Sequence, residues 1–156
     1  MNLDHGIDTN VLLRAVDPAS PDHQLALQSL RDLREQGVVF CITLQNLVEF
    51  WAVSTRPSES RGGLGFTFRE AMAEIEDMES VYMLVPDTPA VLSEWKSILS
   101  ATKAAGVRAH DARLAATFVA NGISHILTFD VADFAGFSGI TAVHPQDVVS
   151  NSQALS

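Results

Sequence analysis

The sequence has a single cysteine and no long apolar run. Cys41, in "VVFCI", is the only cysteine among 156 residues, so no disulfide can form within the chain, and its place in an apolar stretch predicts a buried side chain. The longest uncharged apolar stretches fall well short of the roughly 18 residues that a membrane span needs. "MNLDHG" lacks the basic and then apolar start of a signal peptide. We therefore expect a cytoplasmic protein without membrane contact.

Positive charge is scarce. Ten Lys and Arg residues stand against 19 Asp and Glu residues, which gives a formal net charge of −9. Bulk electrostatics alone would oppose binding to phosphates, so any role with nucleic acid needs a local source of positive charge. A hydrophobic content of 47% suits one compact domain with a filled core. We expect this domain to span residues 1–150 and residues 151–156 to form a disordered tail.

The spacing of apolar residues predicts alternating strands and helices. Strands are expected in "LDHGID", "VVFCI", 81–85, "HILT" and "ITAV". Helices are expected over 10–16, 22–36, 44–54, 67–79, 88–104 and 109–121. Thr43 is expected to cap the third of these helices, and "RPSESRGGLG" (56–65) to form a mobile flap. Because helices separate the strands, the pattern predicts an α/β fold: a three-layer α/β/α sandwich with a short, mostly parallel sheet.

Carboxylates follow the ends of the expected strands, where ligands bind in parallel sheets. Asp8 ends the first strand, Asp130 follows "HILT", and Asp111 lies in the first turn of the helix that precedes "HILT". We expect these three side chains to face one crevice. Glu49 lies within an apolar helix, where a carboxylate is costly unless it is paired or binds a cation.

Each acid also has a purely structural interpretation. Asp8 can cap a helix, Asp111 can complement a helix dipole, Glu49 can pair with an arginine, and Asp130 and Asp133 can be turn residues. Four carboxylates at one end of the sheet are harder to explain this way, because they repel each other. Two unit charges about 5 Å apart repel by roughly 3 kcal/mol at an effective dielectric of about 20. A cation would offset this repulsion. Hard Mg²⁺ or Mn²⁺ is favoured over zinc, because no cysteine or histidine cluster is present.

Magnesium held by carboxylates suits phosphodiester hydrolysis, in which it activates water and stabilises charge on the leaving oxygen. It would also supply the positive charge that the chain lacks. Thr9, Asn10 and Thr128 are expected to hold bound water or the neighbouring carboxylates.

Other chemistries that use aspartate fit less well. Receiver domains and haloacid-dehalogenase-type phosphatases need a lysine near the strand ends, whereas the only lysines, Lys96 and Lys103, lie in an expected helix. The pair His110–Asp111 is also found in HD phosphohydrolases, but the other histidines form no series of metal ligands.

Four motifs, "IDTNVLL", "LVEF", "HDARLAA" and "ILTFDVADF", together resemble the PIN domain, and the loop "RPSESRGGLGFT" is most similar to that of bacterial VapC-type proteins. The resemblance covers about residues 6–148. It implies an α/β/α sandwich, a ribonuclease that depends on Mg²⁺ or Mn²⁺, and an antitoxin that occupies the active site.

The same resemblance assigns roles by position. Asp8 and Asp111 match the metal-binding acids, Glu49 matches the acid in the middle helix, and Asp130 matches the last acidic position. Family members with this ending often have Asn where Asp130 stands, so Asp133 is the alternative for that position.

We therefore predict a metal-dependent ribonuclease that is the toxin of a VapBC-type pair. RNA is the expected substrate, and a cognate antitoxin and a second copy of the chain are the expected partners. The expected helices 22–36 and 44–54 would supply surface for them. The alternative is a non-catalytic PIN-fold module that binds RNA or protein.

Overall fold

The sheet at the centre of the molecule is parallel in every strand pair of the described part of the chain. The computed structural model describes residues 4–156. The spatial order of the strands is β3-β2-β1-β4-β5. Their bounds are β1 His5–Ile7, β2 Phe40–Ile42, β3 Met83–Leu84, β4 His125–Leu127 and β5 Thr141–Val143. The prediction of a short parallel sheet is confirmed.

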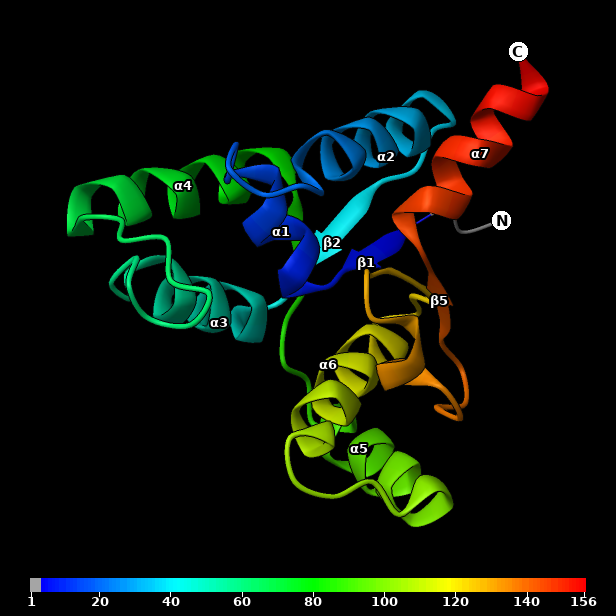
Figure 1. Ribbon diagram of the computed structural model, residues 1–156. Coiled ribbons are helices and arrows are strands. Elements are labelled where there is room, and N and C mark those ends of the chain that lie inside the picture. The colour runs from blue at the N-terminus through cyan, green and yellow to red at the C-terminus, as the bar shows by residue number, and fades with distance from the viewer. Residues whose placement is uncertain (1–3) are drawn as a thin grey trace.

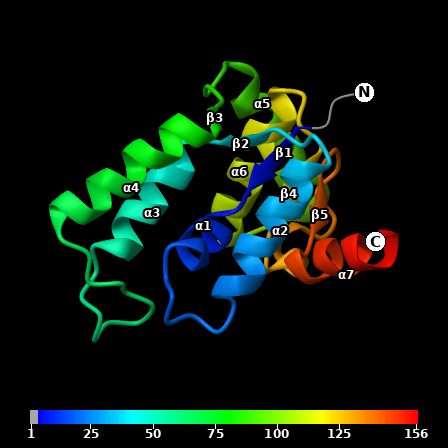
Figure 2. The ribbon, with the colours of Figure 1, turned by 90° about the horizontal axis from the view of Figure 1, so that it is seen from above.

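Helices cover both faces of this sheet, which gives the three predicted layers. Figure 1 shows α1, α2 and α7 on one side and α5 and α6 on the other. In Figure 2, α3 and α4 extend together away from the sheet. The bounds are α1 Thr9–Ala15, α2 His23–Glu35, α3 Leu44–Ser54, α4 Phe68–Val81, α5 Ala90–Thr102, α6 Arg108–Ala120, the 3-10 turn η1 Val131–Phe134 and α7 Pro145–Leu155. None of the helices within residues 4–156 is both long and apolar enough to cross a membrane.

Two apolar cores lie on opposite faces of the sheet, because successive side chains of a strand point to opposite sides. Phe40 and Ile42 of β2 face the core that contains α1 and α2, whereas Cys41 between them faces the core that contains α5 and α6. Cys41 is fully buried, as the sequence predicts, and burial raises the pKa of its thiol to about 11.

Helix α6 lies very close to β1. A Cβ atom on Gly6 would lie 2.5 Å from the ring of Phe118, a residue of α6. Only glycine permits this approach, since a side chain there would push the helix away from the sheet. Gly6 therefore determines how near α6 can come to the strand that precedes Asp8.

The end of the chain differs from the expectation. Residues 151–155 continue α7, so the prediction of a disordered tail over 151–156 is wrong for them. The helix begins with a hydrogen bond from the backbone N of Gln146 to the imidazole of His144, has Pro145 in its first turn and buries Val148. Its sequence, "PQDVVSNSQAL", contains four Ser, Asn or Asp residues, which have modest helix propensity, so the sequence does not predict a helix there.

The connection between α3 and α4 forms compact turns. The backbone N of Gly65 donates to the carbonyl of Arg56 (2.8 Å), and the guanidinium of Arg56 donates to the carbonyl of Arg61 (2.8 Å). A Cβ atom on Gly63 would lie 2.2 Å from the carbonyl oxygen of Pro57, so this turn requires glycine. The predicted mobility of this segment stays a prediction.

The strand order reverses between β1 and β4. From β1 the chain adds β2 and β3 toward one edge, whereas β4 and β5 lie toward the other. In open parallel sheets, ligands bind beyond the carboxyl ends of the strands at such a point. Ile7 is paired in register with Leu127, so the residues that follow these two strands, Asp8 and Thr128, are neighbours.

Candidate active site

Asp8 is the best-buried carboxylate at the carboxyl edge of the sheet. Its Oδ1 accepts a hydrogen bond from the backbone N of Thr9 (2.7 Å), so it also caps α1, as the structural interpretation proposed. Its Oδ2 accepts from Thr128 Oγ1 (2.7 Å) and Asn10 Nδ2 (3.2 Å). Burial raises the pKa of this carboxyl group to about 7, although the bonds from Thr128 and Thr9 act to lower it.

The three residues expected to support the acids lie between them. Thr9 Oγ1 donates to Glu49 Oε1 (3.3 Å). Asn10 Nδ2 contacts both Asp8 Oδ2 and Asp130 Oδ2, the latter at 3.1 Å. Thr128 Oγ1, besides donating to Asp8, accepts from the backbone N of Asp130 (2.9 Å). Neutral donors thus connect Asp8 with Asp130, and Thr9 lies between β1 and Glu49.

Asp111 enters the same group from α6. Burial raises the pKa of its carboxyl group to about 6, and the charges of Asp133 and Glu49 raise it further, against the opposing effect of Arg108 and His110. The charges of Asp111 and Glu49 likewise raise the pKa of Asp8. The structure therefore brings all of the predicted acids to one edge of the sheet. The charge of Asp133 raises the pKa of Asp111, whereas Asp130 accepts a hydrogen bond from Asn10.

The donor set fits a hard divalent cation. All candidate ligands are carboxylate oxygens, and the donors that bond to Asp8 within residues 4–156 are neutral, so no charged side chain that bonds to it offsets its burial. Within residues 4–156, no three His, Cys, Asp or Glu side chains lie close enough to form a ready-made metal site. Proteins usually bind Mg²⁺ through one or two carboxylates, with water as the remaining ligands.

Asn46 is a site residue that the sequence analysis did not identify. Its fully buried amide donates to the carbonyl of Ile7 (3.0 Å) and to Thr9 Oγ1 (3.1 Å), and it accepts from the backbone N and the hydroxyl of Thr43. It therefore fixes the start of α3 to the end of β1. The spacing of Thr43 and Asn46 is that of a capping box, which was the available signal.

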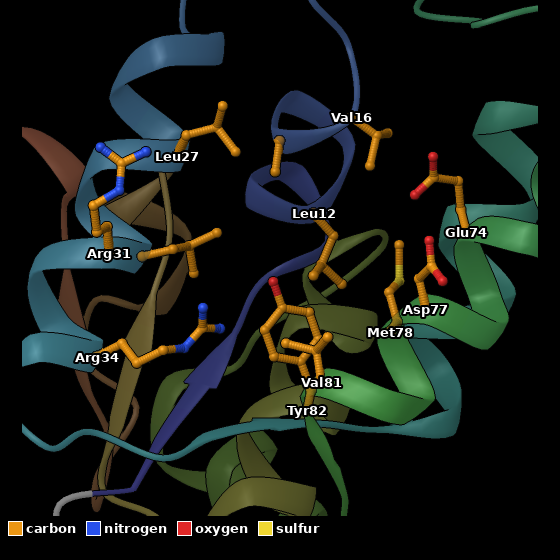
Figure 3. Close-up of a pocket in the computed structure, with 12 residues that line it drawn as sticks. Leu12, Val16, Leu27, Arg31, Arg34, Glu74, Asp77, Met78, Val81 and Tyr82 are labelled. Atoms are coloured by element: carbon orange, nitrogen blue, oxygen red, sulfur yellow. The ribbon is translucent and has the colours of Figure 1, made fainter.

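A separate groove lies between α1, α2 and α4, with a volume of about 320 Å³. Figure 3 shows Arg31 and Arg34 on one wall, Glu74 and Asp77 on the other, and Leu12 between them. Burial raises the pKa of Glu74, and the charge of Asp77 raises it further. None of the acids at the sheet edge lines this groove.

Comparison with known proteins identifies a family. The family model of the PIN domain matches residues 7–138, which confirms the resemblance found in the sequence. No curated protein matches the chain.

Several solved structures share the fold. A chain of VapBC2 from Rickettsia felis, bound to a DNA fragment from its promoter, matches with a TM-score of 0.66 and 12% identity, over 90% of this chain and 98% of that one. A toxin–antitoxin complex from Klebsiella pneumoniae matches with a TM-score of 0.63 and 17% identity, over 90% and 97%. VapC20 from Mycobacterium tuberculosis, a sarcin-ricin loop cleaving toxin, matches with a TM-score of 0.62 and 18% identity, over 86% and 97%.

The raised pKa values predict how stability depends on pH. The folded pKa values of Asp8 (about 7) and Asp111 (about 6) exceed the ordinary value of 3.8. Between pH 3.8 and about pH 7, the folded state therefore binds more protons than the unfolded state. This contribution to stability is therefore present at low pH and lost as pH rises toward 7. Asp8→Asn removes the pH dependence of stability that comes from the Asp8 carboxyl group. The free energy of unfolding of this variant should therefore rise relative to that of the wild type as the pH increases.

Denaturant unfolding with a metal chelator, at about pH 5 and about pH 8, measures this difference. Glu59→Gln, at an exposed position in the connection between α3 and α4, is the control and should follow the wild type at both pH values. A constant difference between Asp8→Asn and wild type would contradict the raised pKa of Asp8.

Proposed function

This chain belongs to the PIN domain family, and from that membership we propose that it is a metal-dependent ribonuclease and the toxin of a VapBC-type pair. The observation that carries the proposal is the buried Asp8 carboxyl group, which has only neutral donors and lies near two further acids at the reversal point of the sheet. The likeness to VapC20, a toxin that cleaves the sarcin-ricin loop, supports RNA as the substrate. We propose the cytoplasm as its location.

We assign metal binding to Asp8 and Asp111, with Glu49 and Asp130 completing the catalytic group. Bound Mg²⁺ or Mn²⁺ would activate water and stabilise charge on the leaving oxygen. The chain's own residues prepare this site: Thr128 and the backbone N of Thr9 orient the Asp8 carboxylate through short hydrogen bonds. The cation would also offset the net charge of −9, which by itself opposes binding of RNA.

The alternative is a PIN-fold module that binds RNA or protein without cleavage. All four acidic positions of the family pattern are present in this chain, and they gather at one edge of the sheet, so the enzyme is the better interpretation.

The first test replaces the two proposed metal ligands. Asp8→Asn and Asp111→Asn keep the shape of each side chain but remove a negative charge, so each should lower the rate of RNA cleavage in Mg²⁺ by at least about 100-fold. Both variants should remain folded by circular dichroism and should lose the rise in melting temperature that metal produces. Wild-type cleavage by either variant would show the metal assignment to be wrong.

A second comparison separates Asp130 from Asp133. We retain Asp130 as the last acid because Asn10 connects it to Asp8. Asp130→Asn should therefore slow cleavage more than Asp133→Asn, measured side by side under the same metal concentration. A larger loss of activity in Asp133→Asn would instead make Asp133 the last acid of the site, in keeping with the effect of its charge on the pKa of Asp111.

We further propose an antitoxin partner and a homodimer. The neighbouring solved structures include toxin–antitoxin complexes. Helix α2, within the expected contact region 22–36, forms one wall of the charged groove shown in Figure 3. On α3, Leu44 and Val48 are 57% and 59% exposed and supply apolar surface for a second copy. At the acidic site, a guanidinium from the antitoxin could pair with two carboxylate oxygens and exclude the metal.

Co-expression with the product of a neighbouring small gene tests the partner. The product should copurify with this chain and inhibit RNA cleavage, and its hold should weaken as salt rises, because exposed charge pairs are screened. A neighbour that neither binds nor inhibits would leave the chain a solitary nuclease.

A further inference from the structure

Gln45 joins two helices that carry acids of the candidate site. It lies at the start of α3, four residues before Glu49 and therefore on the same face of the helix. Its side chain is only 9% exposed. The amide Nε2 donates to the carbonyl of His110 (2.9 Å), and Oε1 accepts from Arg113 Nη1 (2.7 Å). These two contacts on α6 lie on either side of Asp111 in the sequence.

The chemistry of these contacts requires an amide at position 45. A backbone carbonyl can only accept a hydrogen bond and a guanidinium can only donate, so the group between them must do both. A glutamate would place an acceptor against the carbonyl of His110, and an apolar side chain would leave that carbonyl and Arg113 without this partner. The two contacts also fix which way the amide of Gln45 points.

Two further contacts anchor the same turn of α6. Arg113 Nη2 donates to Asp87 Oδ2 (2.9 Å), which holds the guanidinium beside Gln45. Trp95 Nε1 on α5 donates to the carbonyl of Ala109 (3.0 Å). The carbonyls of the two residues that immediately precede Asp111 thus each accept a hydrogen bond from a side chain outside α6.

The start of α6 lacks the usual anchor. Its N-cap residue, Val107, makes no side-chain cap and is 80% exposed. A capped helix has its first turn held by the cap itself. Here the side chains of Gln45 and Trp95 hold the turn from the neighbouring helices α3 and α5.

We propose that Gln45 is a positioning residue, which holds Asp111 in register with Glu49 and Asp8 by clamping the first turn of α6 to α3. Arg113 acts through Gln45 by fixing the orientation of its amide. The proposal rests on the proposed nuclease function for its catalytic consequence, but the clamp itself is a property of the fold. Residues that orient metal ligands affect activity or metal affinity by about 10- to 100-fold.

The test uses Gln45→Met, which has a similar length but can neither donate to the carbonyl nor accept from a guanidinium as the amide does. Gln146→Met on α7 is the matched control, since Gln146 donates to Ser150 within its own helix (3.2 Å). The full-length protein is used throughout. Gln45→Met should lower kcat for RNA about 10- to 100-fold with little change in KM, whereas Gln146→Met should leave both constants unchanged.

A second readout does not depend on activity. Without metal, amide hydrogen exchange at 108–113 should become faster in Gln45→Met, while exchange in the strands stays as in wild type. Exchange at 108–113 in Gln146→Met should also stay as in wild type. The variant that combines Gln45→Met with Arg113→Met should lose little more activity than Gln45→Met alone, because both changes break one network. If Gln45→Met does not fold, Trp95→Phe is subjected to the same measurements, because it keeps an aromatic side chain but removes the indole N–H that donates to the carbonyl of Ala109.

The outcomes separate the two proposals. Unchanged exchange at 108–113 would overturn the clamp, whatever the activity. Faster exchange with an unchanged kcat would overturn the positioning role. If the wild-type protein does not cleave RNA, the proposed function fails, and faster exchange would still support the clamp.

Discussion

The burial of one carboxyl group, that of Asp8, is the constraint on which the rest of the site depends. Water is replaced there by a threonine hydroxyl, a backbone N–H and an asparagine amide, none of which carries a charge. These donors offset only part of the loss of hydration, because the pKa of the group is still raised. The fold therefore maintains an unfavourable site for a negative charge, and further acids on α3 and α6 make it less favourable still. Such an arrangement is typical of a functional site rather than of a stabilising one.

The fold and the candidate acids could be predicted from the sequence, because each depends on patterns of residues that lie close together along the chain. The alternation of strands and helices predicted the parallel sheet, and Asp8, which directly follows β1, lies at its carboxyl edge as expected. Helix α7 was missed because Ser, Asn and Asp, which have modest helix propensity, make up much of its sequence. Gln45 was missed for a different reason: its partners, His110 and Arg113, are 65 and 68 residues away, and a polar residue near a helix start has no spacing that reveals so distant a contact.

Charge has two opposite consequences for the proposed nuclease. The acids that would attract a metal ion also repel the phosphates of RNA, so substrate and cation are expected to enter the site together. The same acids attract any basic side chain of a protein partner, which would compete with the metal. The groove beside α2 is different, since it carries arginines on one wall and acids on the other. The two surfaces thus favour ligands of different charge.

The order of the strands also bears on synthesis of the protein. Asp8 is translated before its hydrogen-bond partner Thr128, which follows 120 residues later, and β1 can pair with β4 only once that part of the chain exists. Parallel pairing between distant segments forms late compared with local structure. A nascent chain attached to the ribosome therefore cannot have a complete site until the residues up to Thr128 have been made. A nuclease built on this topology would lack its complete site while the segment that contains Thr128 is still being made.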